Sequence, residues 1–278
     1  MTGPLAGVAP LIDVHAHFGR GASVDRRRLE AGDRIGISCH VASILGSWGA
    51  GSPTYFSSPD DVTRGNDVML DLADADPGRV RAWIHVNPND TGRALAELDR
   101  GRARGGIGVK LAAARRCDDP LLDPVCSWAA AHRVPVLHHL WQHRTHHWPG
   151  QDISDAADYA RLAARHPTVS FVAAHISGGG DWQHSLPAVA DAPNILFDLS
   201  GSGCDRGMLD DCLRWLGPRR LLWAADVTLC TGLAKLRALD AISLPAADLA
   251  DIHWRNAHRI FPPGAFAATV AVARVMAA

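Results

Sequence analysis

The sequence predicts a (β/α)8 barrel, an α/β fold of the TIM-barrel type, that occupies residues 1–278 as a single domain. Short apolar segments rich in β-branched residues alternate with longer segments of helical character. This alternation is typical of parallel strands joined by crossover helices. Eight such pairs fit within about 250 residues, the usual size of a closed barrel. No linker or low-complexity stretch divides the chain.

Glycine, proline and aspartate bound the predicted strands, and capping signals open several predicted helices. Ser58 precedes Pro59 and Asp119 precedes Pro120, so a capping side chain stands before a proline in the first turn. The predicted strands are Leu11–Ala16, Ile37–Leu45, Val80–Val86, Ile107–Leu111, Val134–Leu140, Val169–Ala174, Ile195–Leu199 and Leu221–Ala225. The predicted helices are Asp25–Ile35, Asp60–Ala75, Thr91–Ala103, Pro120–His132, Ile153–Arg165, Asp181–Ala190 and Asp205–Leu216, followed by Gly232–Ala241 and Ala246–Ile260 as a C-terminal helical extension.

A doubly wound nucleotide-binding fold is the alternative for a chain of alternating strands and helices. That fold requires a glycine-rich phosphate-binding turn after an early strand. The turn after the first predicted strand reads HAHFGR, which lacks this pattern. The glycines at 178–180 follow the sixth predicted strand without the rest of the fingerprint. The barrel is therefore the favoured fold.

The composition excludes several classes of function. The formal net charge of -1 provides no basic field for nucleic acid. No run of eighteen apolar residues is present, and the N-terminal segment lacks the pattern of a secretory signal, so no membrane association is expected. Scattered cysteines without a CxxC pair indicate reduced thiols and a cytoplasmic location. These cysteines are Cys39, Cys117, Cys126, Cys204, Cys212 and Cys230.

Two histidines, His15 and His17, end the first predicted strand in the segment DVHAH. Side chains two residues apart on a strand point to the same side, so both imidazoles can reach one ion. Barrel enzymes place their catalytic groups at the C-terminal ends of the strands, and histidine is the commonest metal ligand. Taken alone, an HxH pair is a weak motif that also fits two structural histidines.

Three further predicted strands end in side chains that can bind a metal. Alternation along the fifth strand turns His139 into the barrel and His138 toward the helices, unless a bulge reverses them. The sixth strand ends at His175, before glycines that allow close approach of the backbone. The eighth ends at Asp226, which must be paired, metal-bound or used as a helix cap. A buried histidine bonded to the backbone is the structural alternative for His139.

In these segments the chain resembles the amidohydrolase superfamily, and within it the group related to aminocarboxymuconate semialdehyde decarboxylase. The matching segments are IDVHAHFG, VKLAAARRCDDPLLDPVCSWAAAHRVPVLHH, VSFVAAHISGG, PNILFDLSGS, GPRRLLWAAD and RNAHRIF, in the family's order and over nearly the whole chain. Two features depart from the family pattern. The usual Gly-Ser-Asp of the last strand is Ala224-Ala225-Asp226, which removes a hydroxyl beside the carboxylate, and HHL at the fifth strand is unusual.

The resemblance implies one divalent metal ion held by His15, His17, His139 and Asp226, with zinc expected and manganese as the alternative. It also implies that His175 acts beside the metal-bound water as a second base or substrate ligand. In the resulting hypothesis the ion lowers the pKa of a bound water, and Asp226 accepts a proton from that water. A homodimer is a further expectation from the resemblance.

Lys110 closes the fourth predicted strand and is one of only two lysines in the chain. In binuclear members of the superfamily a carboxylated lysine bridges two metals at this place, whereas the mononuclear group keeps the lysine unmodified. We expect Lys110 to provide a point charge for a substrate carboxylate, with the bridging role as the less favoured alternative. Arg20, just past the HxH pair, is a second cation. Trp48 and Tyr55, in the loop after the second strand, are expected to border the pocket.

The remaining histidines receive simpler interpretations. His143, His146 and His147 lie in the loop after the fifth predicted strand, where a solvated or substrate-facing loop is favoured over a second metal site. His40 and His85 fall inside strands and are expected to be structural.

Three classes of function stay open from the sequence. The favoured hypothesis is hydrolysis of an amide, lactone or ester bond in a small-molecule substrate through a metal-activated water. The second is non-oxidative decarboxylation of an unsaturated or aromatic carboxylic acid, for which Lys110 or Arg20 would bind the carboxylate. The third is a non-catalytic metal-binding barrel, suggested only by the altered segment before Asp226.

Overall fold

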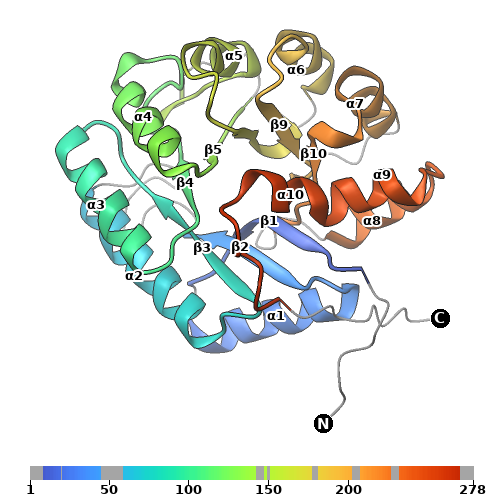
Figure 1. The fold of residues 1–278 in the computed structure, drawn as a ribbon, viewed down its shortest axis with the longest axis horizontal. Helices are drawn as coiled ribbons and strands as arrows, with labels where there is room; N and C mark the ends of the chain where they lie inside the picture. The colour runs from blue at the N-terminus through green and yellow to red at the C-terminus, as the bar shows by residue number, and fades with distance from the viewer. Residues whose placement is uncertain are drawn as a thin grey trace.

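Eight parallel strands form one sheet, and helices surround it (Figure 1). The computed structural model describes residues 9–19, 21–44, 59–141, 147–148, 151–176, 181–201, 207–226 and 232–269. The strand order is β1-β2-β3-β4-β5-β8-β9-β10. The strands are β1 Ile12–His17, β2 Cys39–Ser43, β3 Val80–His85, β4 Gly108–Leu111, β5 Val136–His138, β8 Phe171–Ala173, β9 Ile195–Asp198 and β10 Leu221–Leu222.

A helix follows each of these strands along the chain. The helices are α1 Ala22–Ile35, α2 Pro59–Ala75, α3 Thr91–Ala103, α4 Asp123–His132, α5 Ala156–Arg165, α6 Trp182–Val189, α7 Met208–Leu216 and α8 Gly232–Asp240, with α9 Ala246–Ala250 and α10 Asn256–Ile260 after them. A 3-10 turn precedes α4, and the Asp119 carboxylate accepts the backbone N–H of Leu121 there at 2.9 Å, as its capping signal predicts. Every predicted strand and helix is present, with ends that differ by a few residues.

Backbone hydrogen bonds connect the first strand to the end of the last one. Val14 N–H donates to Trp223 O at 3.2 Å, and Asp226 N–H donates to His15 O at 2.8 Å. These bonds close the sheet into a barrel, so the predicted (β/α)8 fold is confirmed. A short antiparallel pair, β6 (His147–Trp148) with β7 (Gln151–Asp152), lies between β5 and α5 and was not predicted.

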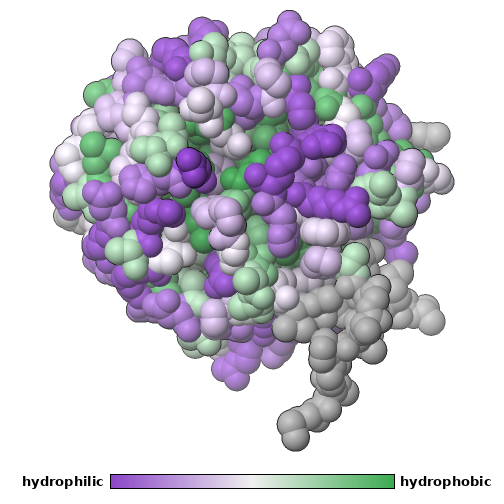
Figure 2. Space-filling view, in the orientation of Figure 1, coloured by the Kyte–Doolittle hydropathy of each residue, from purple (hydrophilic) through white to green (hydrophobic). Residues whose placement is uncertain are grey.

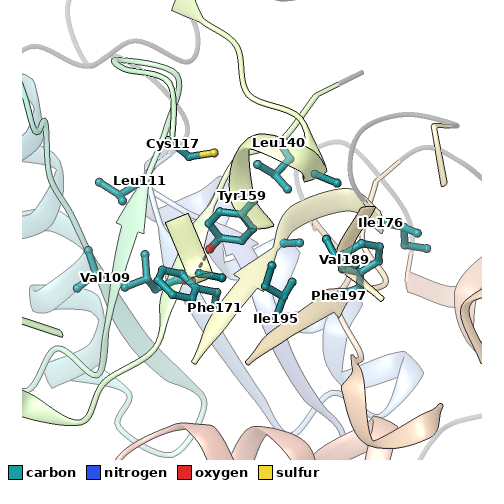
Figure 3. Packing of buried hydrophobic residues seen from close by; sticks show 14 of the residues in the cluster. Val109, Leu111, Cys117, Leu140, Tyr159, Phe171, Ile176, Val189, Ile195 and Phe197 are labelled. Atoms are coloured by element: carbon teal, nitrogen blue, oxygen red, sulfur yellow. Dashed lines mark hydrogen bonds between the residues drawn. The ribbon is translucent and has the colours of Figure 1, made fainter. Parts of the chain in front are cut away.

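The strands alternate between two apolar layers, because successive side chains on a strand face opposite sides. Inside the barrel, Val14, Val41, Trp83, Leu137 and Leu196 belong to one buried cluster. Outside it, side chains from the other faces of the strands pack against the helices. Figure 3 shows part of this outer layer, including Val109, Leu111, Tyr159, Phe171, Ile195 and Phe197.

The C-terminal helical extension covers the N-terminal end of the barrel. Phe261 and Phe266 follow α10 and join the interior cluster, and the ring centroid of Phe261 lies 5.0 Å from that of Trp83. In Figure 1, α10 lies across this end of the barrel. The same face in Figure 2 is mostly hydrophilic, with apolar residues visible toward its centre. The opposite end, where the strands reach their C-termini, holds the candidate functional site.

Candidate metal centre

Each of the eight barrel strands carries a polar side chain toward the barrel interior at its C-terminal end. For most of them the direction follows from alternation, whereas His175 comes directly after the inward-facing Ala174 and has a left-handed φ of 62°. Leu137, Leu196 and Trp83 face the interior, so the residues two positions later also face it. All of these side chains are buried except that of His175, which is partly exposed. They are His15 and His17 from β1, Ser43 from β2, His85 from β3, Lys110 from β4, His139 after β5, His175 after β8, Asp198 from β9 and Asp226 after β10.

A bulge in β1 allows both histidines of this strand to face the interior. Asp13 pairs with His40 and Ala16 pairs with Ala42, so three steps along β1 match two steps along β2. This extra residue means that Val14 and His15 both face inward, whereas Ala16 packs in the outer layer. The first strand begins with inward-facing apolar residues, and the bulge lets His15 and His17 also face inward at the mouth of the barrel.

His15, His17 and Asp226 form a compact group. One nitrogen or oxygen atom from each lies within 4.8 Å of the others. His15 Nε2 is 3.1 Å from His17 Nε2, and His17 Nε2 is 3.4 Å from Asp226 Oδ1. Asp226 has a φ of 49°, in the left-handed region that aspartate tolerates better than most residues. Its backbone N–H, bonded to His15 O, holds it in this conformation.

The donor set of this group fits a divalent cation. His17 Nδ1 lies 3.2 Å from Ser43 O, and a carbonyl can only accept, so the ring proton sits on Nδ1 and Nε2 has a lone pair. Burial lowers the pKa of His17 well below its ordinary value, so the imidazole is neutral and its contact with Asp226 is no ion pair. Asp226 Oδ1 is buried and has no hydrogen-bond partner among the described residues. Two acceptors that face each other in this way are stabilised by a cation between them.

Lys110 brings a positive charge to the same group. Its ammonium Nζ lies 3.0 Å from His15 Nε2. Burial lowers the pKa of Lys110 to about 8, against the opposing effect of Asp198 and Asp226. Burial also raises the pKa of Asp226 to about 7, while Lys110 acts in the other direction. The mouth therefore holds a buried lysine and a buried carboxyl group whose proton affinities lie close to neutral pH.

His139 and His175 form a second pair beside this group. His175 Nε2 lies 3.0 Å from His139 Nδ1, and His175 Nδ1 lies 3.6 Å from Asp226 Oδ2. The ring of His175 stacks on that of His15 at a centroid distance of 4.9 Å. His175 has a φ of 62°. A Cβ added to Gly201 would lie 2.9 Å from the Cβ of His175, so position 201 needs glycine.

The two histidines at the end of β5 have different surroundings. His138 lies in the outer layer, where its ring centroid is 5.8 Å from that of Tyr159. His139 contacts His175 and Trp141 at the mouth. The structure thus brings His15, His17 and Asp226 together and places His139 next to His175, outside the group of three.

Three buried polar residues of the mouth were not singled out as site residues from the sequence. Asp198 and Ser200 lie at the end of β9, next to His15 and His175. Their signal was the alternation from Leu196, which places both on the inner face. His85 was expected to be structural, but alternation from Trp83 directs it into the mouth, where it interacts electrostatically with Lys110. His40 is structural, since its Nδ1 pairs with Asp13 Oδ2 at 2.7 Å.

Several predicted residues lie outside the described part of the chain. These are Arg20, Trp48, Tyr55, His143 and His146. Only the backbone of His147, in β6, is described. Among the described residues, no helix combines the length and apolarity needed to cross a membrane.

The fold and its mouth define a parallel barrel of the class that builds active sites at the C-terminal ends of its strands. A protein-family model described as amidohydrolase matches residues 12–262, and the chain belongs to this family. It is an enzyme of the amidohydrolase type, which argues against the non-catalytic alternative. No curated protein matches the sequence.

Solved structures with the same fold include two decarboxylases and a hydratase. The chain aligns with 2,6-dihydroxybenzoate decarboxylase from Rhizobium at 18% identity and a TM-score of 0.69, over 91% of this chain and 98% of the other. A dihydroxybenzoic acid decarboxylase from Polaromonas, with bound manganese and the inhibitor 2-nitroresorcinol, aligns at 16% identity and a TM-score of 0.69, over 91% and 96%. The 4-oxalomesaconate hydratase from Rhodopseudomonas palustris aligns at 15% identity and a TM-score of 0.65, over 91% and 95%.

Proposed function

We propose that the protein is a metal-dependent hydrolase that cleaves an amide, lactone or ester bond of a small molecule bearing a carboxylate. The observation that carries this proposal is the pair of buried acceptors, His17 Nε2 and Asp226 Oδ1, which face each other at 3.4 Å beside His15. Neutral imidazoles and one carboxylate are the ligand set of catalytic zinc sites. The manganese in the Polaromonas decarboxylase supports a divalent ion in this fold.

We assign one divalent ion to His15, His17 and Asp226, with His139 as the fourth protein ligand. Zinc is expected, manganese is the alternative, and a second ion bridged by a carboxylated Lys110 is less favoured. Such an ion would supply Lewis acidity and lower the pKa of water toward neutrality. In the metal-free protein an uncarboxylated Lys110 donates to His15 Nε2 at 3.0 Å, and an ion bound to that lone pair would replace this contact.

The residues of the chain provide the proton transfers and the orientation. Asp226 accepts a proton from the attacking water as the general base. His175, 3.6 Å from Asp226, hydrogen-bonds the attacking group or the developing oxyanion. Lys110 holds the substrate carboxylate as a buried point charge, and His85 lies beside it on the neighbouring strand. Arg20 and Trp48 are assigned to the pocket border by their places in the sequence.

Decarboxylation is the second candidate, and the buried ammonium of Lys110 is the observation that favours it. A decarboxylase must hold the leaving carboxylate, and Lys110 is buried with 4% of its surface exposed. The two decarboxylases of similar fold act on hydroxybenzoic acids according to their names. The same residues would then orient an aromatic or unsaturated acid.

A product assay on the metal-loaded protein separates the two reactions. The substrates are amides, lactones and esters with and without a carboxylate, together with hydroxybenzoic acids. We expect hydrolysis of a carboxylate-bearing member without release of carbon dioxide. Release of carbon dioxide from a hydroxybenzoic acid would replace the hydrolase proposal with the second candidate.

Lys110→Met tests the assigned substrate contact. Removing the ammonium should raise KM for a carboxylate-bearing substrate by about 10- to 100-fold, since hydrogen bonds to charged groups contribute about 1.5–3 kcal/mol. Metal content, measured by elemental analysis, should not fall, because a cation near the centre is removed. The matched control is the surface variant Asp71→Asn on α2, which should match wild type in both measurements. Equal loss of metal and activity in Lys110→Met would contradict the substrate role.

The assembly and location are part of the same proposal. We infer a cytoplasmic protein that acts as a homodimer of the single-domain chain. Light scattering on the purified chain checks the dimer, and a monomeric mass would contradict it.

A further inference from the structure

Asp198 lies directly behind the candidate metal centre, at the end of β9, and is fully buried. Its Oδ2 is 2.9 Å from His15 Nδ1. Its Oδ1 accepts the backbone N–H of His175 at 2.9 Å, the backbone N–H of Ser200 at 3.0 Å and the Oγ–H of Ser200 at 2.5 Å. One carboxylate therefore contacts one ring and one loop of the site at the same time.

A role as a metal ligand is the first alternative, because Asp198, His15 and His175 also form a compact group. A carboxylate offers about four lone-pair positions. Three hydrogen bonds, from the backbone of His175 and from the backbone and hydroxyl of Ser200, end on Oδ1, and the bond from His15 ends on Oδ2. Both oxygens of Asp198 thus act as acceptors of N–H or O–H groups, which is the role of a residue that supports a ligand from behind.

The contact with His15 fixes the position of its ring proton. The Asp198 carboxylate only accepts, so His15 Nδ1 donates to it and His15 Nε2 keeps its lone pair. His15 Nε2 is the atom that lies 3.1 Å from His17 Nε2, on the side of the metal centre. A carboxylate or carbonyl behind a ligating histidine is the usual device for setting its tautomer.

Ser200 fixes the positions of the ring protons of His175 and His139 in the same way. Its hydroxyl proton is donated to Asp198, so Ser200 Oγ accepts from His175 Nδ1 at 2.9 Å. His175 then carries its proton on Nδ1 and is unprotonated at Nε2. His139 Nδ1, 3.0 Å away, must therefore donate to His175 Nε2, which leaves the lone pair of His139 on its own Nε2.

We propose that Asp198 is a positioning residue that sets the tautomers of His15, His175 and His139, so that each carries its proton on Nδ1. The contacts themselves require neutral rings, because the Lys110 ammonium lies 3.0 Å from His15 Nε2 and two ring nitrogens meet at 3.0 Å between His139 Nδ1 and His175 Nε2. The consequence is that His15 and His139 offer unprotonated Nε2 atoms for a metal. Only this consequence rests on the proposed function, because the tautomers belong to the metal-free protein.

Long-range 1H–15N correlation spectra of the metal-free, 15N-labelled protein at pH 7 test the tautomers directly. We expect Nδ1–H signals for His15, His139 and His175. His132 in α4, whose Nδ1 donates to Trp128 O at 2.8 Å, is the internal standard. Ser200→Ala removes the contact with His175 and a 3.2 Å contact of Ser200 Oγ with His15 Nδ1, but it keeps the bond from His15 Nδ1 to Asp198. His175 and His139 should therefore lose their fixed tautomers while His15 keeps its own.

Asp198→Asn should change the tautomers of all three rings and weaken Mn²⁺ binding by about 10- to 100-fold, the usual effect of removing such a partner. Asp198→Glu should recover part of the affinity, and the surface variant Asp71→Asn should match wild type. An Nε2–H signal at His15 in the wild type would overturn the proposal. Unchanged tautomers in a folded Asp198→Asn or Ser200→Ala protein would also overturn it. Nδ1–H signals in a protein that binds no Mn²⁺ would support this inference while contradicting the proposed function.

Discussion

Burial controls the protonation of single histidines at the barrel mouth and behind it. Desolvation lowers the pKa of the mouth histidines, to about 3 for His85, where Lys110 acts in the same direction. In the outer layer it lowers the pKa of His138 to about 4. Neutral imidazole is the form that binds metals, so a buried mouth suits a metal centre at neutral pH. These buried neutral histidines lower the stability of the folded protein when the pH falls.

His138 gives a prediction at the residue scale. Its folded pKa of about 4 lies below the unfolded value of about 6.5, so the unfolded state takes up the proton first and stability is lost as pH falls through this range. Between pH 7 and 5, the wild type should lose about 2 kcal/mol more unfolding free energy than His138→Gln. Urea unfolding at both pH values measures this difference. An equal loss in the two proteins would contradict the prediction.

The bulged strand β1 is the decisive element of the site. Its extra residue turns His15 inward, and the indole Nε1–H of Trp83 donates to Val14 O at 2.9 Å inside the barrel. Gly108 on the neighbouring β4 leaves room for this indole, because an added Cβ would come within 2.2 Å of Trp83 Cζ3. The strand that carries the histidine pair is thus hydrogen-bonded to a buried ring for which Gly108 leaves room.

Gly108→Ala tests this arrangement at the scale of the element. Overpacking against Trp83 should lower the unfolding free energy by about 1–3 kcal/mol. The matched control is Gly92→Ala in α3, where a Cβ would meet nothing closer than 3.8 Å and helix propensity should stabilise the protein slightly. Chemical denaturation of both variants provides the comparison. A Gly108→Ala protein as stable as wild type would show that the indole has room to move.

At the scale of the whole molecule, one end of the barrel closes the apolar core and the other end carries the candidate metal centre. The C-terminal extension seals one end through Phe261, which is 3% exposed and packs on Trp83. The other end carries the polar side chains of the strand termini. Phe261→Ala should therefore cost about 3–5 kcal/mol of unfolding free energy and leave Mn²⁺ affinity unchanged in the folded protein. Urea unfolding and titration with Mn²⁺ give the two values, and a change confined to Mn²⁺ affinity would contradict this separation.

The sequence predicts the barrel well because local periodicity and turn residues indicate each strand and helix. It also predicts His15, His17 and Asp226, because each ends an apolar strand. The sequence does not indicate the role of Asp198, since its carboxylate is hydrogen-bonded to His15, which is 183 residues away in the chain. The bulge in β1 was equally hidden, because it is defined only by register against β2. Contacts of this kind arise from the pairing of strands in three dimensions, and a linear pattern does not record them.

The most direct measurement is a crystal structure of the protein grown with Zn²⁺ or Mn²⁺, with anomalous scattering to locate the ion. We expect one anomalous peak at about 2.0–2.2 Å from His15 Nε2, His17 Nε2 and an oxygen of Asp226. A peak elsewhere in the barrel, or ordered side chains at the mouth with no peak at saturating metal, would contradict it.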